Sequence, residues 1–367
     1  MRYLGHITAP LTERAARDGR PNTLSTVFSL AEKSLYVDAI DLWIDSMRSR
    51  ERCYVSHGHS DHAREHARIL ATPATAKICR ARFARREQTP IQTSLLGPVK
   101  PPKPPSEFEE HDFNAPWREG EHRLTLFPAG HVLGSSQLMI EGERGKFVYT
   151  GDFKLANSLT AEKPEVKHCD VVLMECTFGR PHYAFPPREE IAAEMAAFAR
   201  DALNCGAIPI FFAYSLGKAQ EAIAILGNAG IPVTVHGAID TLCKVYRECG
   251  VDLPAYARYD AHAAHEPSAF VWPPSGRALP KTLRGKPVRT AILTGWTLDP
   301  STPFRYGVDR GFALSDHADY PALLRYIELA QPKKVLLNHG WRDFVYRLRR
   351  LGIDAEYLEE HAQLALF

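Results

Sequence analysis

The sequence has no excess of either charge, no paired cysteines and no long apolar run, and each absence excludes a class of protein. Its 45 Lys and Arg against 43 Asp and Glu leave a formal net charge of +2, so any nucleic-acid surface must be a local patch. The seven cysteines form no Cys-x-x-Cys pair, which is typical of packing residues in a reducing cytosol. No stretch approaches about 18 uninterrupted apolar residues and the first residues lack an apolar signal core, so we expect a cytoplasmic protein without a membrane span.

What the chain does have is enough apolar material for a large core. It contains 367 residues, of which 45% are apolar, so it can form two domains or one large domain with an insertion. In the first half, residues 52–57 and 146–153 are predicted to be buried strands, and residues 61–70 and 74–87 are predicted to be helices. The proline-rich residues 95–113 are predicted to be a surface loop.

The second half begins with a compact parallel β/α unit. An amphipathic helix is predicted over residues 186–206, followed by strand, loop, helix and strand over residues 207–237. Residues 260–287 are rich in proline and are predicted to be mostly loop. Short strands with one helix are expected over residues 290–358.

The segment YVSHGHSDHA, residues 54–63, places three histidines and an aspartate within six positions directly after an apolar run. In an extended segment, side chains two positions apart point the same way, so His57 and His59 can face one cation while Asp61 and His62 begin a following turn or helix. Neutral imidazole and carboxylate suit zinc, manganese or iron. The alternative is a solvated turn, but such a turn does not require this density of ligands. The segment therefore indicates a metal site.

Three more ligand-type side chains each follow an apolar run: His131, Asp152 and His339. Any one of them alone is more often a hydrogen-bonded structural residue than a ligand. Together with the residues of the first cluster they supply five imidazoles and two carboxylates, which is more than one mononuclear site can use. Two metal ions that share a ligand are therefore predicted.

These motifs resemble the metallo-β-lactamase superfamily, in which an H-x-H-x-D-H run, a lone histidine, a Gly-Asp pair and a late histidine line a binuclear site. The segments LMECTFG, FAYSLGKAQE and GFALSDHADY are similar to the β-CASP branch of that superfamily, whose members cleave nucleic acids, and within it to bacterial ligase-associated DNA exonucleases. The resemblance covers nearly all of the chain from about Tyr36 onward. It implies an α/β protein, an αββα sandwich with an inserted β/α cap, in which residues 1–185 and 308–367 form the sandwich and residues 186–307 the cap.

The resemblance also implies a role for each ligand-type residue. One metal ion would be held by His57, His59 and His131. The other would be held by Asp61, His62 and His339, with Asp152 bridging the two. Zinc is expected for both ions, with manganese as the alternative.

His317 is implied as the general acid for the leaving oxygen, and Glu175 as the group that orients it and keeps it charged. From the residues alone, His317 could instead be exposed beside a helix N-cap made by Ser315 or Asp316, and Glu175 could be a surface carboxylate at a strand end. With these roles the implied catalytic residues are Asp61, Asp152, Glu175 and His317.

A further group of residues is predicted to contact the substrate backbone. Ser215, Gly217 and Lys218 stand at a predicted helix start, where free N–H groups and the helix dipole favour a phosphate. His236 follows the next strand and is expected to be either a phosphate contact or a core or capping histidine. The clusters of arginines are interpreted as solvated helix faces: Arg80, Arg82, Arg85, Arg86, Arg347, Arg349 and Arg350.

The predicted function is a binuclear metal-dependent nuclease, and by resemblance an exonuclease that acts on DNA in repair. Single-stranded DNA is the expected partner, and association with a DNA ligase or helicase is implied by the resemblance alone. An RNA-processing ribonuclease is the alternative, because a histidine at the last motif, as in His339, is similar to RNA-processing members. A small-substrate metallo-hydrolase is less favoured, because it needs neither the cap nor a His317–Glu175 pair.

Overall fold

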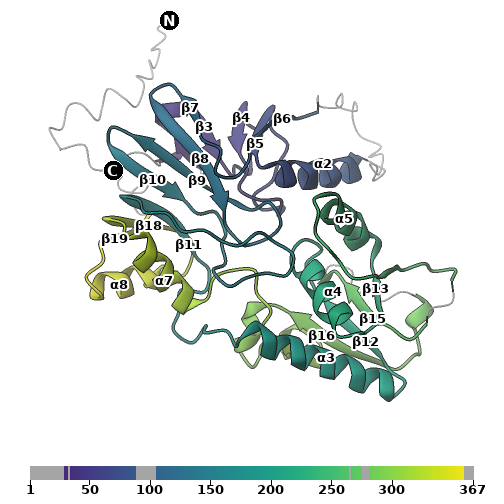
Figure 1. Cartoon of the computed structure of the whole chain (residues 1–367). Coiled ribbons are helices and arrows are strands. Elements are labelled where there is room, and N and C mark those ends of the chain that lie inside the picture. The colour runs from purple at the N-terminus through teal and green to yellow at the C-terminus, as the bar shows by residue number, and fades with distance from the viewer. Residues whose placement is uncertain (1–28, 32–33, 88–104, 264–265, 275–280, 359–367) are drawn as a thin grey trace, which may run out of the picture.

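The computed structural model describes residues 29–31, 34–87, 105–263, 266–274 and 281–358, which form three β-sheets surrounded by helices (Figure 1). The strands of the first sheet lie side by side in the order of the sequence: β1 (Ser29–Ala31), β2 (Ser34–Val37), β3 (Leu42–Ile44), β4 (Arg52–Tyr54), β5 (Arg68–Ala71) and β6 (Glu107–Glu110). The second sheet has the order β19 (Ala355–Tyr357), β18 (Lys334–Gly340), β11 (Val171–Cys176), β10 (Gly145–Tyr149), β9 (Ser136–Gly142), β8 (His122–Pro128) and β7 (Trp117–Glu119).

These two sheets face each other across an apolar core and carry helices on their outer sides. The core between them contains residues without exposed surface from both sheets: Leu42, Tyr54, Leu126, Leu173 and Leu336. Helix α2 (Pro73–Glu87) covers the first sheet, and α7 (Tyr320–Ala330) and α8 (Asp343–Arg350) cover the second (Figure 1). Because both faces of the second sheet are covered, β11 is buried at every position, as its nearly continuous apolar run requires. The predicted αββα sandwich is confirmed.

The third sheet belongs to the cap, which is inserted in the sequence between β11 and α7. Its strands all run parallel, in the order β14 (Ala257–Arg258), β13 (Val233–Val235), β15 (Ala269–Trp272), β12 (Ile208–Phe212), β16 (Val288–Leu293) and β17 (Arg310–Phe312). The inserted β/α cap is therefore confirmed. The predicted boundary at residue 307 lies before β17, whose pairing with β16 carries the sheet to Phe312.

Helices of the cap pack on one face of its sheet, and one of them lies against α2 of the sandwich. They are α3 (Arg188–Asn204), α4 (Lys218–Asn228) and α5 (Gly237–Glu248). Ile78 of α2 and Val132 of the sandwich belong to the same apolar cluster as these helices, so the cap and the sandwich share one packed core. The short elements η5 (Gly295–Leu298) and α6 (Thr302–Tyr306) connect β16 to β17.

The prediction of a helix over residues 61–70 is wrong. Residues 61–66 form turns and irregular chain, and Arg68–Ala71 forms β5, which lies between β4 and β6. A short apolar run is compatible with either a strand or a buried helix segment. Here Ile69, Leu70 and Ala71 are fully buried, and strands on both sides satisfy the backbone N–H and C=O groups.

Both predicted loops contain a strand. Residues 95–104 lie outside the described residues, but Glu107–Glu110 forms β6 at the edge of the first sheet, where charged side chains suit an edge strand. Within residues 260–287, Ala269–Trp272 forms β15 inside the cap sheet, and the neighbouring prolines flank it without interrupting it. Residues 290–358 contain three α-helices, α6, α7 and α8, where one was predicted.

Among the described residues, the helices lack the combination of length and apolar character that a membrane span requires. The seven cysteines are all free thiols. Five of them are buried, as expected for packing residues: Cys53, Cys79, Cys169, Cys176 and Cys243.

We expect Leu336→Ala to lower the free energy of unfolding by about 2 to 5 kcal/mol, because it leaves a cavity where the two sandwich sheets meet. Leu329→Ala is the matched control, since the side chain of Leu329 is 39% exposed, and it should cost about 0.5 kcal/mol or less. Urea denaturation followed by circular dichroism measures both variants. Equal losses would contradict the central place of Leu336 in the core.

Candidate active site

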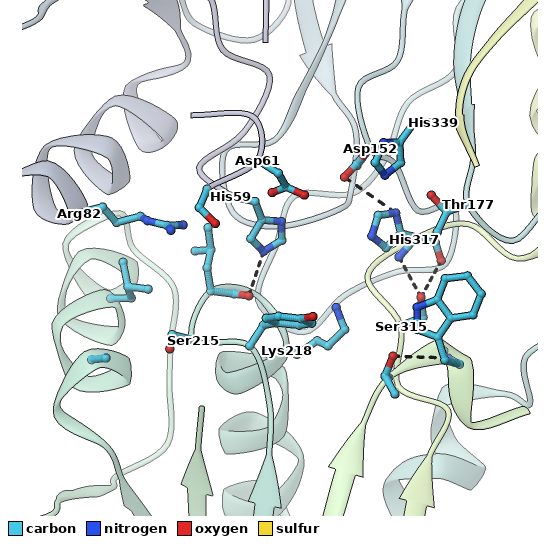
Figure 2. A pocket seen from close by; sticks show the side chains of 18 of the residues that line it. His59, Asp61, Arg82, Asp152, Thr177, Ser215, Lys218, Ser315, His317 and His339 are labelled. Atoms are coloured by element: carbon cyan, nitrogen blue, oxygen red, sulfur yellow. Dashed lines mark hydrogen bonds and ion pairs between the residues drawn. The ribbon is translucent and has the colours of Figure 1, made fainter. Parts of the chain in front are cut away.

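The ligand-type side chains come from several segments that end at one edge of the sandwich (Figure 2). His57 and His59 follow β4, Asp152 follows β10, and His339 lies near the end of β18. Because β10, β11 and β18 run parallel, their carboxyl ends meet at the same edge. The positions that the sequence marked separately after apolar runs are therefore brought together by the sheet.

Three imidazoles surround the carboxylate of Asp152. The Nε2 atoms of His57, His62 and His131 lie 3.7, 3.4 and 3.8 Å from Asp152 Oδ2. His59 adjoins this group, with its Nδ1 3.0 Å from His131 Nε2. His57, His62, His131 and Asp152 are buried, so this is an interior cluster and not a solvated turn.

The rings are oriented by hydrogen bonds at their other nitrogens. His131 Nδ1 donates to the main-chain carbonyl of Asp316 at 2.8 Å, and His62 Nδ1 donates to Asp45 Oδ2 at 2.9 Å. His57 Nδ1 lies 3.0 Å from the hydroxyl of Ser56, which itself donates to Asp45. With Nδ1 held in this way, the Nε2 atoms of His57 and His131 are left with a lone pair, which is the arrangement found in metal-ligating histidines.

Burial also sets the charge of the cluster. It lowers the pKa of His57 and His131 well below the ordinary value, and together with the charge of Lys218 it lowers the pKa of His59 to about 4. These rings are neutral near pH 7, the form that binds metals. Burial opposes the charged form of His62 too, but the carboxylates of Asp152 and Asp45 outweigh it and raise the pKa of that ring well above the ordinary value.

The residues present fit a divalent metal ion. His57 Nε2 is buried and has no hydrogen-bond partner among the described residues, and such an atom costs about 1 to 3 kcal/mol unless a ligand satisfies it. The ligand atoms lie within 4.8 Å of one another in three groups: His57, His59 and His131; His57, His62 and Asp152; His131, Asp152 and His317. Imidazole nitrogens with a carboxylate are a typical donor set for zinc.

Asp61 and His339 stand farther out. Neither belongs to the three groups found in the described part of the chain, and both are exposed. They nevertheless line the same pocket as Asp152 (Figure 2), and the ring of His339 lies 6.2 Å from that of His62. His339 has a left-handed backbone, with a φ of 53°, which is unusual for a residue other than glycine.

His317 and Glu175 form a pair beside the cluster. His317 Nδ1 lies 3.0 Å from both carboxylate oxygens of Glu175 and 4.0 Å from Asp152 Oδ2. Glu175 is 1% exposed and also accepts hydrogen bonds from the Phe153 N–H and the Thr177 hydroxyl, so it is not a surface carboxylate. Burial lowers the pKa of His317, but Glu175 and Asp152 outweigh this effect and raise it to about 9.

The alternative interpretation of His317 as a residue beside a helix cap does not describe the structure. The residue that caps α7 is Asp319, whose carboxylate accepts from the Ala322 N–H at 2.9 Å. Ser315 instead accepts from the His317 N–H at 3.1 Å, which fixes the loop that carries the ring.

The cluster opens into a cavity of about 780 Å³ between the sandwich and the cap. Asp61, Arg82, His317 and His339 line it from the sandwich side, and Tyr214 and Ser215 line it from the cap (Figure 2). The cavity therefore reaches both Asp152 and His317.

The residues predicted to contact the substrate backbone are placed differently from one another. Ser215 lines the cavity and is half-buried. Lys218 also lines it, but its ammonium lies 2.6 Å from the buried carboxylate of Asp316, so its charge is compensated inside the protein. The Gly217 N–H donates to Gln220 Oε1 at 2.8 Å. The contact of these residues with a phosphate stays a prediction.

His236 is not among the residues that line this cavity, although Ala238 of the same helix start is. Its Nδ1 accepts from the Ala238 N–H at 3.0 Å, which makes it the N-cap of α5, and its ring packs edge-on against Trp272. Of the two alternatives for this histidine, the structure shows the capping role.

Three residues of the site are missing from the sequence-based prediction. Asp45 accepts from the Ser56 N–H and the Tyr149 hydroxyl, both at 2.8 Å, as well as from His62. Asp316 accepts from His131 through its backbone and from Lys218 through its side chain. Arg82, interpreted as part of a solvated helix face, lines the cavity and donates to the Gly58 carbonyl. The position of Asp45 directly after a strand was the one signal that could have revealed it.

Two family descriptions match this chain. "Metallo-beta-lactamase superfamily" matches residues 55–197, and "Zn-dependent metallo-hydrolase RNA specificity domain" matches residues 303–363. Together the two ranges span more than half of the chain, and they contain every residue of the cluster.

Individual proteins are similar to this chain as well. A protein of Opitutus terrae named "Probable DNA ligase" is 37% identical over 338 residues, which are 90% of this chain and 31% of that protein. The RNase J-like protein of Methanocaldococcus jannaschii is 23% identical over 269 residues, 60% of this chain and 64% of that one. This chain thus spans about a third of the first relative and less than two thirds of the second.

A solved structure shares the fold. The crystal structure of a protein of unknown function from Enterococcus faecalis superimposes with a TM-score of 0.51 and 13% sequence identity, over 80% of this chain and 76% of that one. The matched ranges cover both parts of the sandwich, and the parallel cap is inserted between them. The chain therefore belongs to the metallo-β-lactamase superfamily, in its β-CASP branch.

Proposed function

We propose that this protein is a metal-dependent nuclease that hydrolyses phosphodiester bonds in DNA, acting as an exonuclease in DNA repair. The observation that carries the proposal is the His317–Glu175 pair, which lies beside the ligand cluster and faces the cavity between sandwich and cap. An alkoxide leaving from a phosphodiester needs a proton, and a histidine held charged by a carboxylate can supply it. A thiolate leaving from a thioester has no such need of a proton donor.

Each residue of the cluster has a place in this proposal. His57, His59 and His131 would hold one cation, while Asp61, His62 and His339 would hold a second, with Asp152 between them. A divalent cation bound there would polarise the scissile phosphate and lower the pKa of the attacking water. Zinc is the first expectation, as the description of the matched C-terminal domain suggests, and manganese is the alternative.

The protein supplies the proton and its orientation. Glu175 accepts the Nδ1–H of His317, which leaves the Nε2–H available to the leaving oxygen. Glu175 is itself fixed by the Phe153 N–H, so the imidazole has one preferred orientation. In this proposal, His317 donates the proton and Glu175 orients it, as in other histidine–carboxylate pairs of general acid–base catalysis.

Similarity to named relatives supports DNA as the substrate. The relative that aligns over 90% of this chain is named as a DNA ligase and is about three times as long as the aligned segment, which also supports a functional association with a ligase. An RNA nuclease is the second candidate, because residues 303–363 match an RNA specificity domain and another relative is named RNase J-like.

The first test compares DNA with RNA on one gel. Single-stranded DNA and RNA of the same sequence, labelled at the 5′ or the 3′ end, are incubated with the protein in zinc or manganese. We expect stepwise shortening of DNA, with the order of label loss giving the polarity, and no cleavage by Asp152→Ala, because that carboxylate faces three imidazoles. Metal content measured in the same preparations should fall in the variant.

Three other results would change the conclusion. Cleavage of RNA alone would favour the second candidate. Products of internal length from the start would indicate an endonuclease. Full activity of a metal-depleted Asp152→Ala protein would refute the metal-dependent mechanism.

We expect His317→Ala to retain its metal and to slow DNA hydrolysis by a factor of about 10² to 10⁴, because the leaving oxygen loses its proton donor. Thymidine 5′-p-nitrophenyl phosphate has a leaving group that needs little protonation, so its hydrolysis should be slowed much less. His168→Ala, which changes an exposed histidine outside the cavity, is the control. Equal slowing of both substrates would mean that His317 has another role.

We expect Asp45→Asn to weaken metal binding by a factor of about 10 to 100, since this carboxylate orients His62 at 2.9 Å and also holds Ser56 beside His57. Titration of the metal-free protein with zinc in a competing chelator measures the affinity. Asp41→Asn alters an aspartate that bonds Tyr36 at the surface and serves as the control. Unchanged affinity in Asp45→Asn would show that ring orientation does not limit binding.

A further inference from the structure

A second cavity adjoins the first. Its volume is about 910 Å³, and it lies between the segments that follow β11 and β18 and the cap elements η5 and α6. We name it the aromatic groove, after the rings and guanidinium groups that line it: Arg180, His182, Trp296, Arg305, Tyr306 and Trp341.

Trp296 joins the two cavities. It lines the cavity that contains Asp152 and His317, and it also lines the aromatic groove. Its ring is fixed by Phe178, with ring centres 4.7 Å apart, and by Tyr183 at 5.4 Å. A chain that leaves the reaction centre past Trp296 therefore enters the groove directly.

The groove offers flat groups and little net charge. The guanidinium of Arg180 lies 3.3 Å from the centre of the Trp341 ring and pairs with Asp343. Arg305 pairs with Asp299 at 3.2 Å. Because these arginines have carboxylate partners, phosphate attraction is moderated, and their planes remain suited to stacking.

Aromatic rings alternating with guanidinium planes are how proteins bind single-stranded nucleic acid without sequence preference, because every base has a flat face to stack. In a duplex the base faces are already stacked on one another and are not available. The chemistry of the groove therefore selects unpaired nucleotides.

We propose that the aromatic groove is a stacking subsite for the unpaired nucleotides of the substrate on one side of the scissile phosphate. This inference rests on the proposed nuclease function. It adds a single-strand requirement that the ligand cluster and the His317–Glu175 pair do not themselves impose.

The test measures affinity against oligonucleotide length. Fluorescent single-stranded DNA of two to about twenty nucleotides is titrated with protein carrying Asp152→Ala to prevent cleavage, alone or combined with Tyr306→Ala, Tyr306→Phe or Phe304→Ala. Phe304 belongs to the same helix as Tyr306, is 89% exposed and does not line either cavity, which makes it the matched control. Thermal unfolding confirms that each protein is folded.

Loss of one stacking ring should weaken binding of the longer oligonucleotides about tenfold in Tyr306→Ala. Tyr306→Phe keeps the ring and should bind like the parent, as should Phe304→Ala. The dinucleotide, which is too short to reach the groove, should not distinguish the variants. Replacing the bases by abasic sites should remove the difference at every length.

Equal affinity of Tyr306→Ala and the parent at all lengths would overturn the subsite. So would a loss that persists with abasic strands, because the ring would then not be stacking on bases. Cleavage of the same oligonucleotides by the unmodified protein separates the two proposals. If it cleaves them and Tyr306→Ala binds normally, only the groove assignment fails; if it neither binds nor cleaves them, the nuclease function fails as well.

Discussion

The buried ion pair between Lys218 and Asp316 couples the two parts of the molecule at the reaction centre. Lys218 begins α4 of the cap, and its ammonium lies 2.6 Å from the Asp316 carboxylate. The main-chain carbonyl of the same Asp316 holds His131, and the next residue is His317. Removing one partner of a buried pair leaves an uncompensated charge and costs about 3 to 5 kcal/mol. The cap therefore cannot shift without disturbing a ligand-type histidine and the candidate acid.

On the sandwich side of the site, a single carboxylate orients several groups. Asp45 receives hydrogen bonds from Ser56, His62 and Tyr149, and its backbone adopts a φ of 44°. A non-glycine residue in that conformation is held there by its surroundings. We interpret this backbone strain as the cost of directing one carboxylate to four donor groups on three residues. The result is a set of rings whose Nε2 atoms converge before any ligand arrives, which reduces the reorganisation that binding requires.

The ligand-type residues could be predicted because the signal is local. His57 and His59 are two positions apart, and Asp152 and His339 stand at strand ends. The two-residue period of a strand and the position after an apolar run are therefore enough to identify them as candidate ligands. Asp316 could not be predicted, since its contacts to His131 and Lys218 join residues 185 and 98 positions away. The predictions for residues 61–70 and for Ala269–Trp272 were wrong for a related reason. Pairing with distant strands decided the conformation of both segments, and the local sequence pattern did not.

The cavity is built from both parts of the molecule. The cluster and the His317–Glu175 pair belong to the sandwich, and they would act on a phosphodiester whatever its sugar. The cap supplies the opposite wall, and it reaches the cluster itself where the Leu216 carbonyl lies 3.2 Å from His59 Nε2. A protein distinguishes RNA from DNA by contacts to the 2′-hydroxyl. Such contacts would come from groups that face the cavity beside the cluster. The cap contributes several polar side chains to this lining: Tyr214, Ser215, Lys218, Thr241 and Thr294. Both walls of the cavity, the sandwich with its metal-ligand motifs and the cap, belong to the site where such contacts would form.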